Sequence, residues 1–158
     1  MSAEDPLLKL LLRFKEEGVE YVLVGGQAVR LNGFLRATED VDVLLEATRD
    51  NGRKVKQAMS FLAASRELDP DWFEASDGKP DNIRVADELI VDLLFAANGE
   101  TYESVQPFVR EVVVEEVPIR VLNIDGLLRT KTDYREKDLL DRQVLNRIRQ
   151  RLEDERGE

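Results

Sequence analysis

Three aspartates have the spacing and surroundings expected of side chains that hold a metal ion. Asp40 and Asp42 are separated by one residue, and side chains so spaced on a strand share one face, with Cα atoms ~6.5–7 Å apart. Two such carboxylates suit Mg²⁺, a hard cation usually held by one or two carboxylates and by substrate phosphates. Asp92 lies in the apolar run 89–95, where an ionised carboxylate needs a compensating cation or donor. A strand with one solvated face, or an aspartate paired with an arginine, would show the same patterns.

A pair of glycines lies between a segment typical of a strand and a segment typical of a helix. Gly25 and Gly26 follow the apolar run 21–24 and precede the helical pattern of 27–31. Glycine lets backbone N–H groups approach a ligand, and the start of a helix favours an anion, so a triphosphate could dock at this turn. A tight connection that binds nothing is the more frequent reason for such a pair.

Taken in order along the chain, these motifs resemble the signature of nucleotidyltransferases with the polymerase-beta-like fold. Residues 21–45 read YVLVGGQAVRLNGFLRATEDVDVLL, a Gly-Gly turn followed by Asp-x-Asp on the next strand. The Arg-x-Thr-x-Asp-x-Asp form is similar to that of the abortive-infection-type, toxin–antitoxin-associated members. Downstream, Lys131 and residues 135–141, which read REKDLLD, resemble the Lys motif and the Arg-x-Lys-Asp-x-x-Asp motif of the same families. The resemblance covers residues 21 to about 145.

This resemblance implies a Mg²⁺-dependent enzyme that transfers a nucleoside monophosphate from an NTP to an acceptor and releases pyrophosphate. Mn²⁺ is an alternative cofactor, and the acceptor is a tRNA, a protein or a small molecule. A cognate toxin–antitoxin partner is also implied. The catalytic, metal-binding residues would be Asp40, Asp42 and Asp92, and the nucleotide-binding residues would be Gly25, Gly26, Arg36 and Lys131. The second glycine replaces a serine of many relatives, so a hydroxyl contact to the γ-phosphate is lost.

Composition narrows the chemistry and the location. The chain has no histidine and no cysteine, which excludes an imidazole base, a thiol nucleophile and Cys/His zinc sites. Its formal charge of −10 argues against a broad phosphate-binding surface, so a polynucleotide acceptor would need a local basic patch or a partner subunit. Apolar runs are shorter than the ~20 residues of a membrane span, and Glu4 and Asp5 stand where a signal peptide is basic. We therefore expect a cytoplasmic protein with no membrane partner.

The periodicity predicts one α+β (α/β) domain over residues 1–158, with a mixed sheet flanked by helices and with C-terminal helices. A helix is expected from Asp5-Pro6 to Gly18, and Trp72 and Phe73 are expected to pack between two loops. We expect a hairpin turn at residues 115–116, with Pro118 at an edge. Strands are predicted at 21–24, 41–45, 83–85, 89–95, 112–114 and 119–122, and helices at 27–31, 51–62 and, twice, after 124.

Other interpretations stay open from the sequence. The fold could serve a non-catalytic antitoxin, nucleotide sensor or scaffold, or it could transfer nucleotides to small molecules such as antibiotics. A plain α+β domain with acidic surface clusters is the third alternative. Considered alone, Lys137 and Asp141 suit an i,i+4 pair on a solvated helix. Asp138 and Asp141 are expected to orient basic groups, and Thr38 to stabilise the turn before Asp40.

Overall fold

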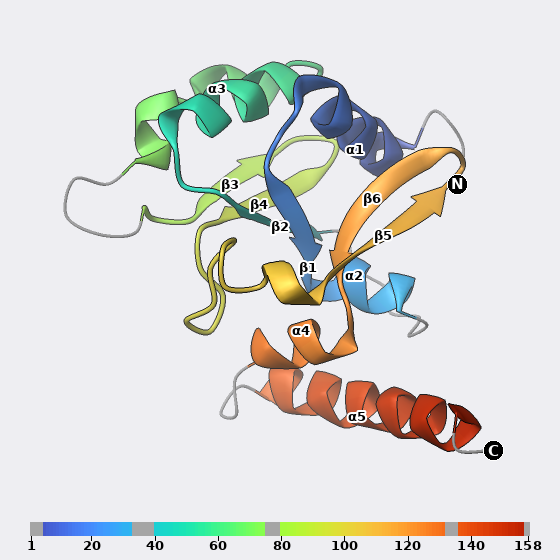
Figure 1. The fold of residues 1–158 in the computed structure, drawn as a ribbon. Helices are drawn as coiled ribbons and strands as arrows, with labels where there is room; N and C mark the ends of the chain where they lie inside the picture. The colour runs from blue at the N-terminus through green and yellow to red at the C-terminus, as the bar shows by residue number, and fades with distance from the viewer. Residues whose placement is uncertain (1–4, 33–39, 75–79, 132–135, 157–158) are drawn as a thin grey trace.

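The computed structural model describes residues 5–32, 40–74, 80–131 and 136–156 (Figure 1). Six strands form one sheet in the order β3-β4-β2-β1-β6-β5. β2 is antiparallel to β1 and parallel to β4, while β1 is parallel to β6 and the two outer pairs are antiparallel. The strands are β1 (Tyr21–Val24), β2 (Asp40–Leu45), β3 (Ile83–Ala86), β4 (Ile90–Leu94), β5 (Val109–Val114) and β6 (Val117–Leu122).

Helices cover both faces of this mixed sheet, which confirms the expected α+β class. α1 and α3 lie together above the sheet in Figure 1, while α2, α4 and α5 lie below it. The α-helices are α1 (Pro6–Glu17), α2 (Gly25–Leu31), α3 (Arg49–Ala58), α4 (Ile124–Arg129) and α5 (Glu136–Arg156), and short 3₁₀ turns span Ala63–Glu67, Pro70–Phe73 and Gln106–Phe108.

The predicted caps determine where the first helix begins and ends. The Asp5 side chain accepts a hydrogen bond from the Leu7 N–H, and Gly18 ends α1 in the left-handed conformation, with φ of 70°. Leu10 and Phe14 of α1 are fully buried in the core, whereas Leu12 is exposed. The buried face of α1 consists of Leu7, Leu8, Leu10, Leu11 and Phe14.

Two local predictions were wrong. Phe73 is buried as expected, but Trp72, the preceding residue of the same 3₁₀ turn, is exposed. Pro118 lies on β6, which pairs with both β5 and β1, so it is not on the edge strand. Pro118 pairs with Val113 of β5. The one register position that joins β6 to β1 is Val121 opposite Leu23, so the missing N–H of Pro118 does not break a ladder hydrogen bond to β1. The hairpin itself forms as predicted, with positive φ at Glu115 and Glu116.

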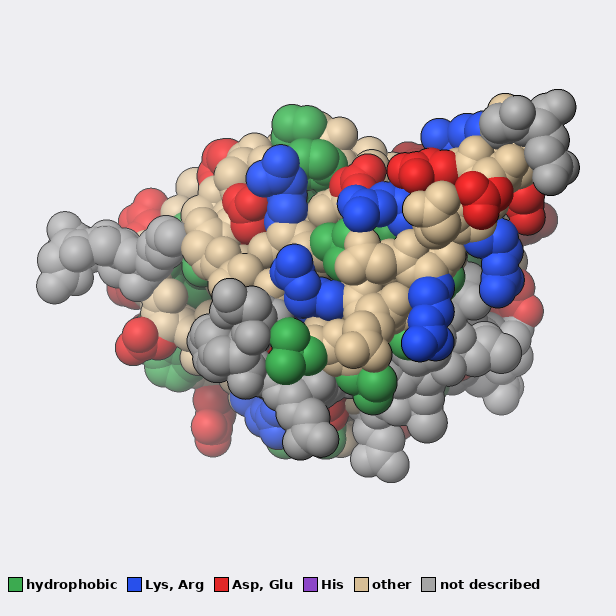
Figure 2. Space-filling view, turned by 90° about the horizontal axis from the view of Figure 1, so that it is seen from below, with side chains coloured by type: hydrophobic (Ala, Val, Ile, Leu, Met, Phe, Trp, Pro, Cys, Tyr) green, Lys and Arg blue, Asp and Glu red, His purple; other side chains and the backbone are tan. Residues whose placement is uncertain are grey.

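The described side chains of the last helix are buried only in its N-terminal part. α5 buries Asp138, Asp141 and Leu145 and packs against α4, whereas every residue from 149 to 156 is exposed. Figure 2 shows this side of the molecule, where acidic and basic side chains are interspersed over the described surface. Among the described helices, none combines the length and the apolar character needed to span a bilayer.

Candidate active site

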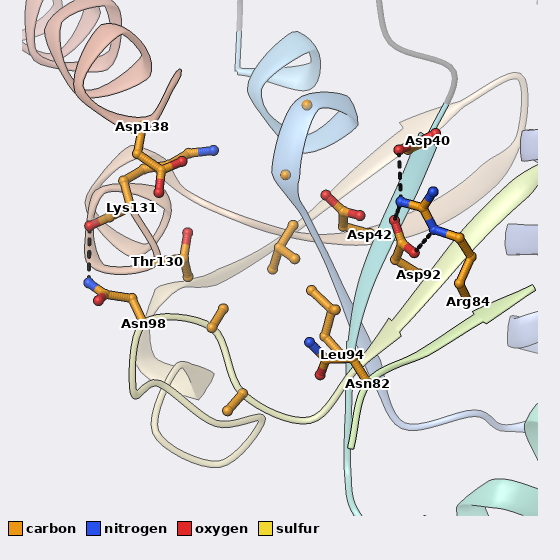
Figure 3. Close-up of a pocket in the computed structure, with 15 residues that line it drawn as sticks. Asp40, Asp42, Asn82, Arg84, Asp92, Leu94, Asn98, Thr130, Lys131 and Asp138 are labelled. Carbon is orange, nitrogen blue, oxygen red and sulfur yellow. Dashed lines mark hydrogen bonds and ion pairs between the residues drawn. The ribbon is translucent and has the colours of Figure 1, made fainter. Parts of the chain in front are cut away.

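Strand pairing aligns one side chain from each of three adjacent strands. Arg84 of β3 pairs with Asp92 of β4, and Asp92 pairs with Asp42 of β2. Asp40 lies two residues before Asp42 and therefore on the same face, while Val41 between them is fully buried on the other face. The expected shared face of Asp40 and Asp42 is present, and Asp92 is beside them (Figure 3).

Arg84 joins two of the three carboxylates, and the sequence analysis did not identify it. Its Nε donates to Asp92 Oδ1 at 2.8 Å and its Nη2 to Asp92 Oδ2 at 3.1 Å, with a longer contact of 3.4 Å from Nη2 to Asp40 Oδ2. Arg84 is thus the compensating cation that Asp92 required. A signal did exist, because a hairpin that turns at residues 87–89 places position 84 opposite position 92.

Burial and the neighbouring carboxylates both act on Asp42. Burial, a hydrogen bond with Asp92 and the charges of Asp92 and Asp40 raise the pKa of Asp42 from 3.8 to about 6, while Lys131 acts in the opposite direction. The shift has the sign expected when like charges share a partly desolvated site. An added cation at this position would therefore stabilise the ionised form of Asp42.

The predicted glycine turn touches the acidic cluster directly. α2 begins at Gly25 itself, which has φ of 72°, a conformation that residues with a Cβ rarely adopt. A Cβ at Gly25 would lie 2.2 Å from Asp42 Oδ2, closer than real atoms approach. Glycine is therefore required here for two reasons, its backbone conformation and its contact with the Asp42 carboxylate.

Lys131 lies across the pocket from the aspartates, within a network of buried polar groups. Its Nζ is 3.0 Å from Asp141 Oδ2, and the two side chains are only 7% and 4% exposed. Asn98 and Arg142 both donate to the Lys131 carbonyl oxygen, which fixes the backbone at Lys131. The solvated-helix interpretation was wrong for Asp138 and Asp141, because both are buried. The pair between Asp141 and Lys131 agrees with the expected orienting role of Asp141.

A single pocket of about 500 Å³ brings most of the predicted residues together. Its acidic end holds the three aspartates with Arg84, and Figure 3 shows Lys131, Thr130 and Asn98 at the opposite side. The predicted residues that line it are Gly25, Gly26, Asp40, Asp42, Asp92 and Lys131, and those that the sequence analysis missed include Asn82, Arg84, Asn98 and Thr130. Arg36, Thr38 and the Lys137 side chain lie outside the described residues.

The carboxylates at the acidic end are suitable ligands for a divalent cation, although they are not at present arranged around a common position. Three carboxylates offer the hard oxygen ligands that Mg²⁺ and Mn²⁺ take. Within the described residues, however, no three acidic side chains are already grouped as metal ligands. Arg84 accounts for this at Asp92, because it engages both carboxylate oxygens. The residues fit a cation that replaces the guanidinium.

Comparison with solved structures identifies a similar fold. The chain resembles a Thermotoga maritima protein that carries a provisional assignment as a nucleotidyltransferase, with a TM-score of 0.56 and 16% sequence identity. The match covers 94% of this chain and 91% of that protein. At this identity the similarity concerns the fold, here a nucleotidyltransferase-like mixed sheet flanked by helices. No protein-family model and no curated protein matches the sequence.

Proposed function

We propose that this protein is a Mg²⁺-dependent nucleotidyltransferase, which transfers a nucleoside monophosphate from an NTP to an acceptor and releases pyrophosphate. The observation that carries the proposal is the convergence of Asp40, Asp42 and Asp92 on one pocket, next to a glycine turn that touches Asp42. The fold shared with the Thermotoga maritima protein supports the same reaction class.

Each group at the pocket has a role in the proposed reaction. The three aspartates would hold Mg²⁺, or Mn²⁺ in its place. When bound, the cation supplies a Lewis acid that polarises phosphoryl oxygens and neutralises charge on the transferred group. The backbone N–H groups of Gly25 and Gly26 would face the triphosphate, because neither residue has a side chain to block it. The Lys131 ammonium, whose charge is already felt at Asp42, would offset the negative charge that develops on phosphate oxygens.

The acceptor is proposed more coarsely. A tRNA, a protein and a small molecule all remain candidates, because the structure contains no separate acceptor domain among its described elements. The face drawn in Figure 2 mixes both signs of charge and the chain has a net charge of −10, so we expect a polynucleotide to bind by a local contact.

A single labelling experiment tests the reaction. The protein is incubated with each α-labelled NTP, with Mg²⁺ or Mn²⁺, and with separate pools of tRNA, protein and small molecules. We expect one pool to retain label, pyrophosphate to appear, and Asp42→Asn or Asp92→Asn to abolish both. Asp50→Asn is the matched control, since Asp50 is an exposed aspartate of α3 outside the pocket. Full activity in Asp42→Asn would contradict the proposal.

A second candidate function has its own supporting observation. The pairs Arg84–Asp92 and Lys131–Asp141 already engage a proposed metal ligand and a proposed phosphate-binding residue with partners from the protein itself. This arrangement also suits a non-catalytic nucleotide-binding or antitoxin-type module of the same fold. NTP binding without pyrophosphate release, for every acceptor pool offered, would favour this alternative. Thermal stabilisation by Mg²⁺ with NTP is expected for both functions, so product formation is the measurement that separates them.

A further inference from the structure

Arg84 is held by strand register in direct contact with two proposed metal ligands. It lies on β3, an edge strand, and its position opposite Asp92 is set by the β3–β4 ladder. The guanidinium takes both oxygens of Asp92, at 2.8 and 3.1 Å, and reaches Asp40 Oδ2 at 3.4 Å. This two-pronged geometry is the strongest common form of an arginine–carboxylate pair. The contact therefore fixes the orientation of the Asp92 carboxylate as well as its charge.

A divalent cation at this cluster needs the same oxygens. Mg²⁺ takes oxygen ligands at about 2.0–2.1 Å in near-octahedral geometry, so a ligand oxygen must turn its lone pair to the metal. In Asp92 each oxygen uses one lone pair to accept a hydrogen bond from Arg84, so the guanidinium sets the direction of the remaining lone pairs. A guanidinium beside the cation would also repel it. Pairing with Arg84 and binding of the metal are consequently competing states of the same carboxylates.

Arg84 has room to leave. Its side chain is 59% exposed, whereas that of Asp92 is 17% exposed. Releasing the guanidinium to solvent breaks its contacts with the carboxylates but opens no hole in the core, because most of the Arg84 side chain is already exposed. A rotation of the Arg84 side chain about its own bonds is enough to free Asp92.

We infer that Arg84 is a positioning residue that holds Asp92 and Asp40 while no divalent cation is present and gives them up when the cation binds. The inference rests on the proposed function in taking these carboxylates as metal ligands. Without Arg84, three neighbouring negative charges would repel one another and turn toward solvent. With it, the ligands stay aligned, and the metal alone binds more weakly than it would to the bare carboxylates.

Direct metal binding without nucleotide tests this competition. Mn²⁺ binding is followed by electron paramagnetic resonance, and Mg²⁺ binding by calorimetry, for the native protein and for Arg84→Gln, Arg84→Lys and Arg49→Gln. Arg49 is the control, because its side chain is about as exposed as that of Arg84 and also pairs with an aspartate, Asp71, which is not among the residues that line the pocket.

The expected results differ in sign from those of a merely structural arginine. Arg84→Gln should bind both cations about 3–10-fold more tightly, the range expected when one exposed charge-assisted pair no longer competes. It should also melt at a lower temperature in EDTA, since the aspartates lose their cation. Arg84→Lys keeps the charge but only one donor group, so its affinity should lie between native and Arg84→Gln. Arg49→Gln should leave metal affinity unchanged.

The outcomes separate this inference from the proposed function. Metal affinity in Arg84→Gln and Arg84→Lys that equals or falls below the native value overturns the inference, even if nucleotide transfer is observed. Tighter metal binding in Arg84→Gln supports it, even if no acceptor is ever labelled. If Arg84→Gln fails to fold, the charge-preserving Arg84→Lys decides the question by the same comparison with the native protein.

Discussion

Replacing Asp42 by asparagine should stabilise the metal-free protein. The pKa of Asp42 is raised from 3.8 to about 6, first by burial and then by Asp92 and Asp40, so the folded state resists the ionised form. Each unit corresponds to about 1.4 kcal/mol, which gives about 3 kcal/mol at most. Because Asp42 is not fully buried, solvent screening reduces this to about 2 kcal/mol. Asparagine keeps the shape and removes the charge.

The dependence on pH follows from the sign of the shift. Below pH 3.8 the carboxyl is protonated in both the folded and the unfolded chain, so Asp42 imposes no penalty. As the pH rises from 3.8 to about 6, the unfolded chain releases its proton first, and the folded state is progressively penalised. Above pH 6 the penalty is complete. The stability difference between Asp42→Asn and the native protein should therefore be near zero at pH 3.8 or below and about 2 kcal/mol at pH 7.5.

Urea denaturation followed by far-UV circular dichroism, in EDTA and at a series of pH values, measures this difference. The same change corresponds to a rise in melting temperature of about 4–8 °C for a chain of this size. Asp87→Asn is a control of opposite sign, because N–H groups of Ala64 and Glu88 lower the pKa of Asp87 and that variant should lose stability at neutral pH. An Asp42→Asn protein that is no more stable than native at pH 7.5 would refute the reasoning.

The remaining predictions concern the glycine turn and the Lys131 side of the pocket. Gly25→Ala should destabilise the protein by about 2–4 kcal/mol, because the residue has a positive φ and the new Cβ would clash with Asp42. Gly18→Ala has a similar φ but open space around the Cβ, so it should destabilise the protein by only about 1 kcal/mol. Thermal melts of the two variants measure this difference in stability. Lys131→Met should cost up to about 3–5 kcal/mol, because it removes the buried cation that pairs with the Asp141 carboxylate. Adding Asp141→Leu should recover much of that loss in urea titrations. No recovery in the double variant would show that the ion pair itself is required.

Local rules account for the parts of the site that lie within one element. Strand alternation places Asp40 and Asp42 on one face, and glycine chemistry identifies the turn at Gly25, because both depend on residues adjacent in sequence. The alignment of Asp92 with Asp42 depends on which strands pair and in which register, and periodicity within one strand carries no such information. The expectation that Asp92 lies beside Asp40 and Asp42 came instead from the resemblance to a known signature.

Contacts between distant elements account for what was missed. The Lys131–Asp141 pair depends on how α5 returns against α4, and an i,i+4 rule applied to one helix could not indicate it. Trp72 and Phe73 were both expected to pack between two loops, yet of these two residues of the 3₁₀ turn only Phe73 is buried. The position of Arg84 opposite Asp92 follows from antiparallel pairing in the β3–β4 hairpin, once the turn is placed at residues 87–89.

The alternation of side chains along β4 also disfavours a shifted register between β2 and β4 during folding. Val91 and Leu93 flank Asp92 and are fully buried on the opposite face. Sliding β4 by one residue would drive the carboxylate into the apolar interior and push both aliphatic side chains into water, two errors that reinforce each other. Chains that assemble the sheet incorrectly are thus rejected by the same alternation that builds the pocket, so a molecule that has reached its stable core has its three aspartates already in line.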